Sequence, residues 1–409
     1  MKRRLLPILM TLVLVCALPI WAAFVTSGDV TNPLVCTAWA DPIEGTFTQV
    51  TDETTLKAAV EKGESVILMQ DIEISSRLEV KQSLTLDLNG YVLKMSGTGG
   101  VIRIKKYAEY AVVEVEIKDG MPGRVHTGGY AALPAGGVIT GGKADKGGGI
   151  LLGGGCTLKL TGGCITDCHA TDTGGGGVVL NGDTAILYMS GTARIENCTA
   201  GGMWGAAIFN SGTMYADGGI VDGTVNNQGT IRLSEGAAAE TVFNGTVYNR
   251  SAGTIIAGIY NETVENNGTI TGGTFCGGVT DDGGTIEDGA YETVKFNSDN
   301  GAQAKEEKVL RGQKVPNPAA PTKSGHTFID WYLGDVLYDF NTPVTAPLTL
   351  TAEWERVPAS SGGYYYYPTT DTKADDAKGS PKTADPGVAL YAALSLLSLT
   401  GLTCTTKKR

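Results

Sequence analysis

A glycine-punctuated array of near-repeats between Gly147 and about Thr274 restricts the fold of this chain more than any other feature. Apolar residues alternate within each unit, as Leu158 and Leu160 do, which indicates short strands. Strands this short cannot form a core alone, so they must stack on the next copy. The array therefore predicts an all-β, right-handed parallel β-helix. Three pairs of segments match, at offsets of 28, 29 and 30 residues: 147–152 with 175–180, 158–162 with 187–191, and 165–170 with 195–200.

Composition supports this prediction and excludes some partners. Glycine supplies 58 of the 409 residues, about twice its average share, without a Gly-X-Y period. We expect glycines at the corners of the coils, where a positive φ is required. Asn-rich segments at 210–213, 226–230 and 266–269 predict the same corners, because Asn also tolerates left-handed conformations. The net charge of −11 and the absence of a basic stripe argue against nucleic acid as a partner.

The first residues have the pattern of an export signal. A short basic segment precedes an apolar run at 5–25, and residues 1–40 are assigned to a signal peptide and pre-domain segment. Cleavage after Ala40 fits a small-x-small site better than cleavage after Ala22 or Ala23. An uncleaved N-terminal membrane helix is the alternative.

A helix is predicted over Thr51–Lys62, because Leu56, Ala59 and Val60 follow helical spacing. We expect this helix to cover the open first coil of the solenoid. The order of helix, "VILMQDIEI" and "SLTLDLNGYVL" resembles the entry to pectate-lyase-like parallel β-helices, and adhesin-type β-helix proteins of bacterial surfaces share it. The resemblance implies architecture rather than activity, and the β-helix is assigned to residues 41–290.

Residues 120–146 are less regular and are interpreted as a loop that leaves the coil. Such loops carry binding functions more often than the rigid scaffold does.

Residues 291–356 resemble one Listeria-Bacteroides repeat, the B-repeat of internalins. The resemblance implies a small β-grasp-like module. Its aromatic residues supply enough buried area for a core in so small a domain. These residues are Phe296, Phe328, Trp331, Phe340 and Trp354. Residues 357–379 have low apolar content and are predicted to be a disordered linker.

Residues 380–409 resemble the sorting signal that a Gram-positive sortase recognises. A Pro-Lys-Thr-Ala motif at 381–384 precedes an apolar segment at 388–402 and a basic tail. The resemblance implies that a sortase thiol attacks the Thr383 carbonyl. Peptidoglycan would then receive the new terminus. A permanent tail anchor is the alternative, although the apolar segment is short for a membrane span. The recognition residues would be Pro381, Lys382, Thr383 and Ala384. The membrane is expected to be a partner only through the signal and this tail.

Cysteines and histidines give little support for a metal site. Cys168 and Cys198 occupy equivalent places in consecutive coils and are a candidate disulfide. A ladder of buried small residues and a loop bridge between Cys164 and Cys168 are the alternatives. No Cys-x-x-Cys pair is present, and the histidines fall in different modules, so neither a metal nor a cofactor is expected.

Catalysis is the alternative to binding, because the pectate-lyase-like fold that this chain resembles hosts lyases and glycoside hydrolases. The candidate acids are Asp167, Asp172, Asp183, Asp217 and Asp222, but most adjoin turn glycines, where Asp commonly makes local hydrogen bonds. The sequence therefore predicts a non-catalytic adhesin or display protein of a Gram-positive cell wall, binding host or environmental glycans or glycoproteins. The alternative is a wall-tethered polysaccharide lyase or glycoside hydrolase.

Overall fold

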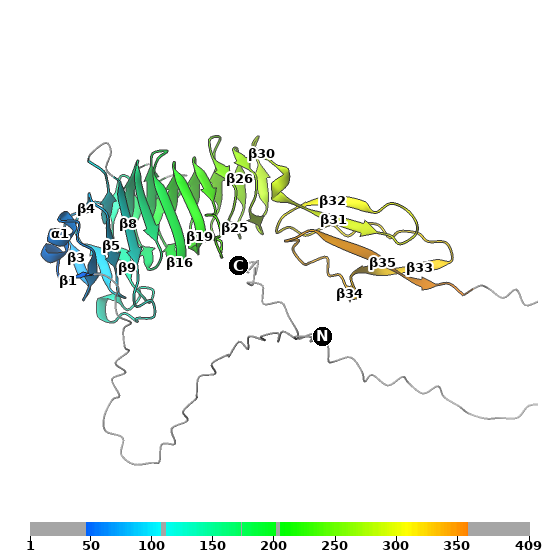
Figure 1. Cartoon of the computed structure of the whole chain (residues 1–409), viewed down its shortest axis with the longest axis horizontal. Helices are drawn as coiled ribbons and strands as arrows, with labels where there is room; N and C mark the ends of the chain where they lie inside the picture. Colours follow the sequence, from blue (N-terminus) through cyan, green and yellow to red (C-terminus); the bar gives the residue numbers. More distant parts are fainter. Residues whose placement is uncertain (1–45, 108–111, 173, 202–204, 359–409) are drawn as a thin grey trace, which may run out of the picture. The chain divides into compact units, whose positions relative to one another are not determined.

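Stacked parallel strands make up most of the structure, a computed structural model that describes residues 46–107, 112–172, 174–201 and 205–358. The predicted parallel β-helix is confirmed: strands from successive coils pair in parallel and lie side by side along one axis (Figure 1). The sorting residues Pro381, Lys382, Thr383 and Ala384, and the segment 1–45, lie outside the described residues.

Sheet A, the largest sheet of the β-helix, contains two columns of strands that join through the long strands β16 and β19. The first column consists of β1 (Thr48–Val50), β2 (Val66–Leu68), β5 (Leu84–Asp87), β8 (Val113–Lys118), β12 (Cys156–Leu160), β16 (Ile186–Glu196), β19 (Thr213–Asp222), β21 (Thr230–Arg232), β24 (Thr254–Ile255), β27 (Thr269–Ile270) and β30 (Thr285–Ile286). The second adds β3 (Ile72–Ile74), β6 (Val92–Met95), β9 (Val138–Thr140), β13 (Cys164–Thr166), β22 (Val242–Phe243), β25 (Ile259–Tyr260) and β28 (Thr274–Phe275).

Two further sheets complete the coils. Sheet B consists of β4 (Leu78–Val80), β7 (Ile102–Ile104), β11 (Ile150–Gly153), β15 (Val178–Asn181), β18 (Ile208–Asn210), β20 (Val225–Asn227), β23 (Val247–Asn249), β26 (Val264–Asn266) and β29 (Val279–Asp281). Sheet C consists of β10 (Lys143–Ala144), β14 (His169–Ala170) and β17 (Thr199–Ala200). The strands are short because the chain must turn at each corner of every coil.

Helix α1 (Glu53–Glu61) covers the first coils, as predicted (Figure 1). It begins at Asp52, whose carboxylate accepts from the backbone N–H of Thr55 at 2.8 Å in a capping box. Leu56, Ala59 and Val60 are buried and pack with the first strands in one core. Burial of a Leu or Val side chain contributes about 1.5–3 kcal/mol, which holds the helix over the open end.

Inside the β-helix, each coil places side chains at equivalent positions, so the side chains of successive coils stack. Alternating residues point inward, as Val113, Val115 and Ile117 of β8 do. Towards the C-terminal coils the aliphatic stack gives way to aromatic rings: Phe243 and Tyr260 stack at 4.9 Å between ring centroids, and Tyr260 continues onto the next coil. Parallel register therefore turns sequence repeats into continuous internal stacks.

The Asn-Gly segments have a different role from the one predicted. Gly229 does not adopt a positive φ, but a Cβ at this position would lie 2.0 Å from the carbonyl oxygen of Gly212 on the preceding coil. Close approach of neighbouring coils requires glycine there, and the same holds at Gly268. Left-handed backbone occurs elsewhere, at Asp167 and Asn197, which have φ of 51° at equivalent places in two coils.

Residues 120–146 are not simply a loop, contrary to the prediction. They contain a short 3₁₀ helix, η1 (Gly128–Tyr130), and then β9 and β10, which pair with the next coil. Val138 and Ile139 of β9 are fully buried, because the chain returns to the stack after its excursion.

A five-stranded mixed sheet follows the β-helix, after a second 3₁₀ helix, η2 (Asp288–Ala290). Its strands are β31 (Tyr291–Asn297), β32 (Lys305–Leu310), β33 (His326–Leu333), β34 (Val336–Leu337) and β35 (Leu348–Arg356). The first and last strands pair in parallel, and Trp331 packs edge-on against Phe296 at 5.1 Å in the core. The predicted aromatic core is therefore present, and the described part of this module contains no helix after η2.

Candidate functional site

The outward face of sheet A carries two rows of side chains, each made by residues paired in register across successive coils. We call the first the tyrosine row; it consists of Lys159, Tyr188, Tyr215 and Arg232. The second, the threonine row, consists of Thr213, Thr230, Thr254, Thr269 and Thr285. Parallel strands lie about 4.8 Å apart, so each row presents one side chain at that interval.

Two stacked rings form the centre of the tyrosine row. The rings of Tyr188 and Tyr215 lie 4.4 Å apart between centroids with an interplanar angle of 5°. The Arg232 guanidinium lies over the Tyr215 ring at 5.6 Å, a cation–π contact. Desolvation, and then the neighbouring Tyr215, raise the pKa of Tyr188. Both rings are half-buried, and a tyrosine hydroxyl can donate and accept hydrogen bonds.

Lys159 is the first member of the tyrosine row, and its ammonium group has a fixed partner. Its Nζ donates to the Glu114 carboxylate at 2.6 Å, and this hydrogen bond raises the pKa of Lys159. The cation therefore has a fixed partner on the same face, and its charge is largely compensated.

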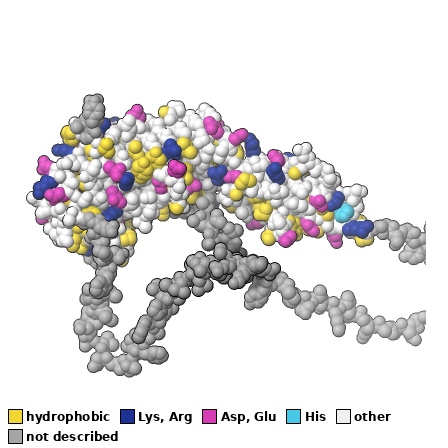
Figure 2. Space-filling view, viewed as in Figure 1, with side chains coloured by type: hydrophobic (Ala, Val, Ile, Leu, Met, Phe, Trp, Pro, Cys, Tyr) yellow, Lys and Arg dark blue, Asp and Glu magenta, His cyan; other side chains and the backbone are white. Residues whose placement is uncertain are grey.

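The threonine row adds hydroxyl groups that both donate and accept hydrogen bonds. Its first four members are half-buried, and Thr285 is exposed. Carboxylates adjoin the tyrosine row: Glu116 is the register neighbour of Lys159 on β8, and Asp217 follows Tyr215 on the same face of β19. Figure 2 shows one side of the molecule, where hydrophobic side chains gather on the β-helix amid mostly uncharged surface.

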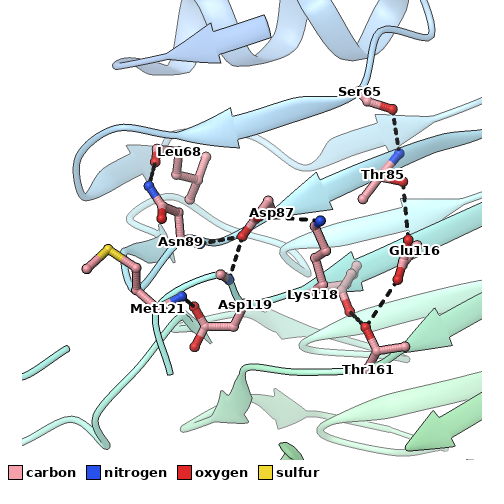
Figure 3. A network of polar contacts seen from close by, with 12 residues as sticks. Ser65, Leu68, Thr85, Asp87, Asn89, Glu116, Lys118, Asp119, Met121 and Thr161 are labelled. Carbon is pink, nitrogen blue, oxygen red and sulfur yellow. Dashed lines mark hydrogen bonds and ion pairs between the residues drawn. The ribbon is translucent and has the colours of Figure 1, made fainter. Parts of the chain in front are cut away.

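A buried carboxylate network lies near the N-terminal coils (Figure 3). Asp87, only 3% exposed, accepts from the backbone N–H groups of Asn89 and Gly120, each at 2.8 Å. Asp119 likewise accepts from the N–H groups of Gly90 at 2.6 Å and Gly137 at 2.7 Å. These carboxylates bind the corners of neighbouring coils together.

Two further residues extend that network along sheet A (Figure 3). Lys118 places its Nζ 3.7 Å from Asp87, and Thr161 donates to Glu116 at 3.3 Å. Sequence analysis missed these residues, although Asp-Leu-Asn-Gly at 87–90 and Lys-Asp-Gly at 118–120 carry turn signals that could have revealed them.

The candidate acids of the rival enzyme function have separate surroundings. Asp217 in β19 accepts from the Ser234 backbone N–H at 2.8 Å and from its hydroxyl at 2.6 Å. Asp167 lies exposed in a left-handed turn, and Asp183 is exposed before β16. Asp217 therefore has a structural partner, although it lies within β19 and not in a turn.

Cys168 and Cys198 are free, buried thiols, so the candidate disulfide is not formed in this structure. Their sulfurs donate to different backbone carbonyls, that of Thr166 at 3.4 Å and that of Ile165 at 3.7 Å. The hydrogen bond with Cys198, followed by burial, raises the pKa of Cys168 well above its ordinary value. The alternative of a ladder of buried small residues describes this geometry.

Residues 293–353 match the family described as the Listeria-Bacteroides repeat domain. A "Putative membrane protein" of Evansella cellulosilytica is 37% identical over 67 residues, covering 15% of this chain and 10% of that protein. A "Putative Gly-rich membrane protein" of the same organism is 39% identical over 67 residues, covering 15% and 8%. The match thus spans about a tenth of these relatives' length. No solved structure matches the chain.

Among the described residues, no helix has the length and apolar character needed to cross a membrane. The apolar segments at 5–25 and 388–402 lie outside those residues.

Proposed function

We propose that this protein is a non-catalytic cell-surface protein whose β-helix binds an extended glycan or glycoprotein. One observation carries the proposal: the tyrosine and threonine rows continue in register over successive coils and offer a face of aromatic and hydrogen-bonding side chains. A repeating polymer meets the same kind of group at each coil, so weak contacts add along its length. The surface location is supported by the Listeria-Bacteroides repeat and by the membrane-protein names of the relatives.

Attachment to a Gram-positive wall is part of the proposal. The motif Pro381, Lys382, Thr383 and Ala384, followed by an apolar and then a basic segment, supports recognition by a sortase. The test is expression of the full chain in Gram-positive cells with and without their sortases. We expect the protein in the wall fraction of cells with sortase, and a Thr383→Ala variant in the membrane fraction. Equal wall attachment of both forms contradicts sorting at this motif.

Binding without chemistry is tested on an array of glycans and polysaccharides with the full chain. We expect retained protein and unchanged carbohydrate, judged by mass spectrometry of the bound material. Release of shortened or unsaturated sugars would establish the rival enzyme function instead. Asp217→Asn is the first variant to examine in that case, since Asp217 adjoins the tyrosine row in register with Ser190.

A further inference from the structure

A basic hollow of about 290 Å³ lies on the outward face of sheet B, on a different sheet from the tyrosine row. Its lining contains cationic, amide and backbone groups but no carboxylate. The lining residues are Arg103, Lys105, Lys106, Leu151, Gly153, Gly154 and Asn181. Three cations around one hollow are unusual on a chain with a net charge of −11.

The hollow exists because one strand lacks a side chain at an outward position. In β11, Ile150 and Leu152 point into the core, so Leu151 and Gly153 face outward. Gly153 pairs with Asn181 on one side, and on the other its position lies against Lys105, whose Cα would be 3.8 Å from an added Cβ. The side chains of Lys105 and Asn181 therefore flank an empty position.

Neighbouring groups contact two of these residues, Lys105 and Lys106. The backbone N–H of Lys106 hydrogen-bonds the buried Cys156 sulfur, which fixes the end of this segment. Lys105 Nζ lies 4.9 Å from the centroid of the Tyr107 ring, and Lys81 Nζ lies 5.0 Å from the same centroid. Lys81 and Lys105 thus share contact with the Tyr107 ring.

Among the residues that the structure describes, no carboxylate forms an ion pair with Arg103 or Lys105. Glu79 is the register neighbour of Arg103, yet within the described segments no acid lies within 4.0 Å of the charged nitrogens of Arg103 or Lys105. Both side chains are half-buried. Partly desolvated, unpaired cations attract an anion more strongly than fully solvated ones do, because screening is weaker.

We propose that this hollow binds a tetrahedral oxyanion, the phosphate or sulfate group of a sugar or surface polymer. The Arg103 guanidinium offers a planar pair of donors that matches such a group, and Lys105 adds a point charge. Asn181 donates from the opposite side, and Leu151 offers an apolar contact to the carrier. A phosphate monoester carries about −1.5 to −2 charge and three terminal oxygens, which suits several cations better than one carboxylate does.

The test is isothermal titration calorimetry of the full chain at low salt. The probes are inorganic phosphate, inorganic sulfate, a glucose phosphate, a glucose sulfate and glucuronate. We expect phosphate or sulfate compounds to bind more tightly than glucuronate, and added sodium chloride to weaken them. The two sugar esters separate the phosphate source from the sulfate source. No measurable binding of any probe, or glucuronate binding as tightly as the esters, overturns the proposal.

Variants then locate the site. Arg103→Gln and Lys105→Gln are each expected to weaken binding about tenfold, because each removes a charge-assisted hydrogen bond. Gly153→Ser fills the hollow without changing charge and should weaken binding similarly. Its added Cβ would lie 3.1 Å from the Ile104 carbonyl oxygen, so thermal melting must confirm that the variant folds.

Lys146→Gln is the matched control, since Lys146 is exposed, lies outside the hollow and gives the same change in net charge. Its affinity should stay within about twofold of the natural chain. If Lys146→Gln weakened binding of the probes as much as Arg103→Gln does, the effect would come from net charge alone. That result would overturn the assignment of binding to the hollow. Unchanged affinity in folded Arg103→Gln and Lys105→Gln would do the same.

Discussion

Asn227 donates from its side-chain Nδ2 to the side-chain Oδ1 of Asn249 at 2.8 Å, and both residues are fully buried. The same bond joins Asn210 to Asn227 at 2.7 Å and Asn249 to Asn266 at 2.8 Å. These hydrogen bonds form a ladder of buried asparagine side chains, which ends at the Asp281 carboxylate, an acceptor for Asn266 at 3.1 Å. Each amide satisfies its neighbour, so this polar stack avoids the desolvation cost that an unpaired buried amide carries.

Asn227→Ala should therefore destabilise the β-helix by about 3 kcal/mol, because it leaves a donor on Asn210 and an acceptor on Asn249 without their partners. The free energy of unfolding in urea checks this value. Asn267→Ala is the control: Asn267 donates to the Asp282 carbonyl at the surface, and its loss should cost less than about 1 kcal/mol. Equal losses in the two variants would contradict a stabilising ladder.

The free energy of unfolding should fall in acid, partly because the Glu53 carboxylate becomes protonated. Hydrogen bonds from Lys57 and from Ser75 lower the pKa of Glu53 from 4.5 to about 2. A lowered pKa in the folded state stabilises the fold above pH 4.5, and this contribution is lost as the pH falls towards 2. Glu53→Gln should reduce stability at pH 7 by about 1 kcal/mol, since solvent screens the pair.

The pH profile distinguishes this role of Glu53. The difference in unfolding free energy between the natural chain and Glu53→Gln should shrink between pH 4.5 and about 2. A difference that stays constant over that range would show that Glu53 acts by packing alone.

The ion pair between Glu292 and Arg311 should contribute more to stability than the exposed pair between Lys295 and Glu306 does. Arg311 donates to the Glu292 carboxylate at 2.6 Å, and the Glu292 side chain is 8% exposed. Arg311→Met leaves that carboxylate unpaired and should cost about 2 kcal/mol. Lys295, paired with Glu306 at 2.8 Å, is half exposed, so Lys295→Met should cost about 0.5 kcal/mol or less. Chemical denaturation measures both values, and similar costs would contradict the ranking.

The stacked thiols should resist alkylation until the chain unfolds. Burial raises the pKa of Cys164, and the hydrogen bond with Cys198 and burial raise that of Cys168 above 9.0. A raised thiol pKa stabilises the folded state below pH 9, and this contribution is lost as the pH rises further. Iodoacetamide at pH 8 should label Cys168 and Cys198 only after denaturation. Absence of labelling under denaturing, non-reducing conditions would instead indicate a disulfide.

The proposed binding face predicts a defined loss of affinity. Tyr188→Ala or Tyr215→Ala should weaken binding of a glycan identified on the array about tenfold, because each removes half of the stacked pair. Tyr248→Ala on sheet B is the matched control and should leave affinity unchanged. Surface plasmon resonance with the immobilised glycan gives these values. A loss in the Tyr248 variant alone would move the binding face to sheet B.

Much of the fold follows from local patterns in the sequence. Alternation at Leu158 and Leu160, and the repeat of these positions at Leu187 and Met189, predicted strands that stack in parallel, and these pairs are in register. Asp52 and the apolar spacing of Leu56 predicted α1 for the same reason. Such signals come from local spacing and from repeats along the chain, so the sequence determined the β-helix, its helical cover and the module with Trp331 in its core.

Only the tertiary structure decided which side chains meet across coils. Tyr188 and Tyr215 stack because β16 and β19 pair in parallel with these two residues in register. The hollow likewise needs Gly153 to fall beside Lys105 and Asn181, which come from other coils. Turn conformation and register depend on packing against the preceding coil, and a single sequence carries no local signal for either.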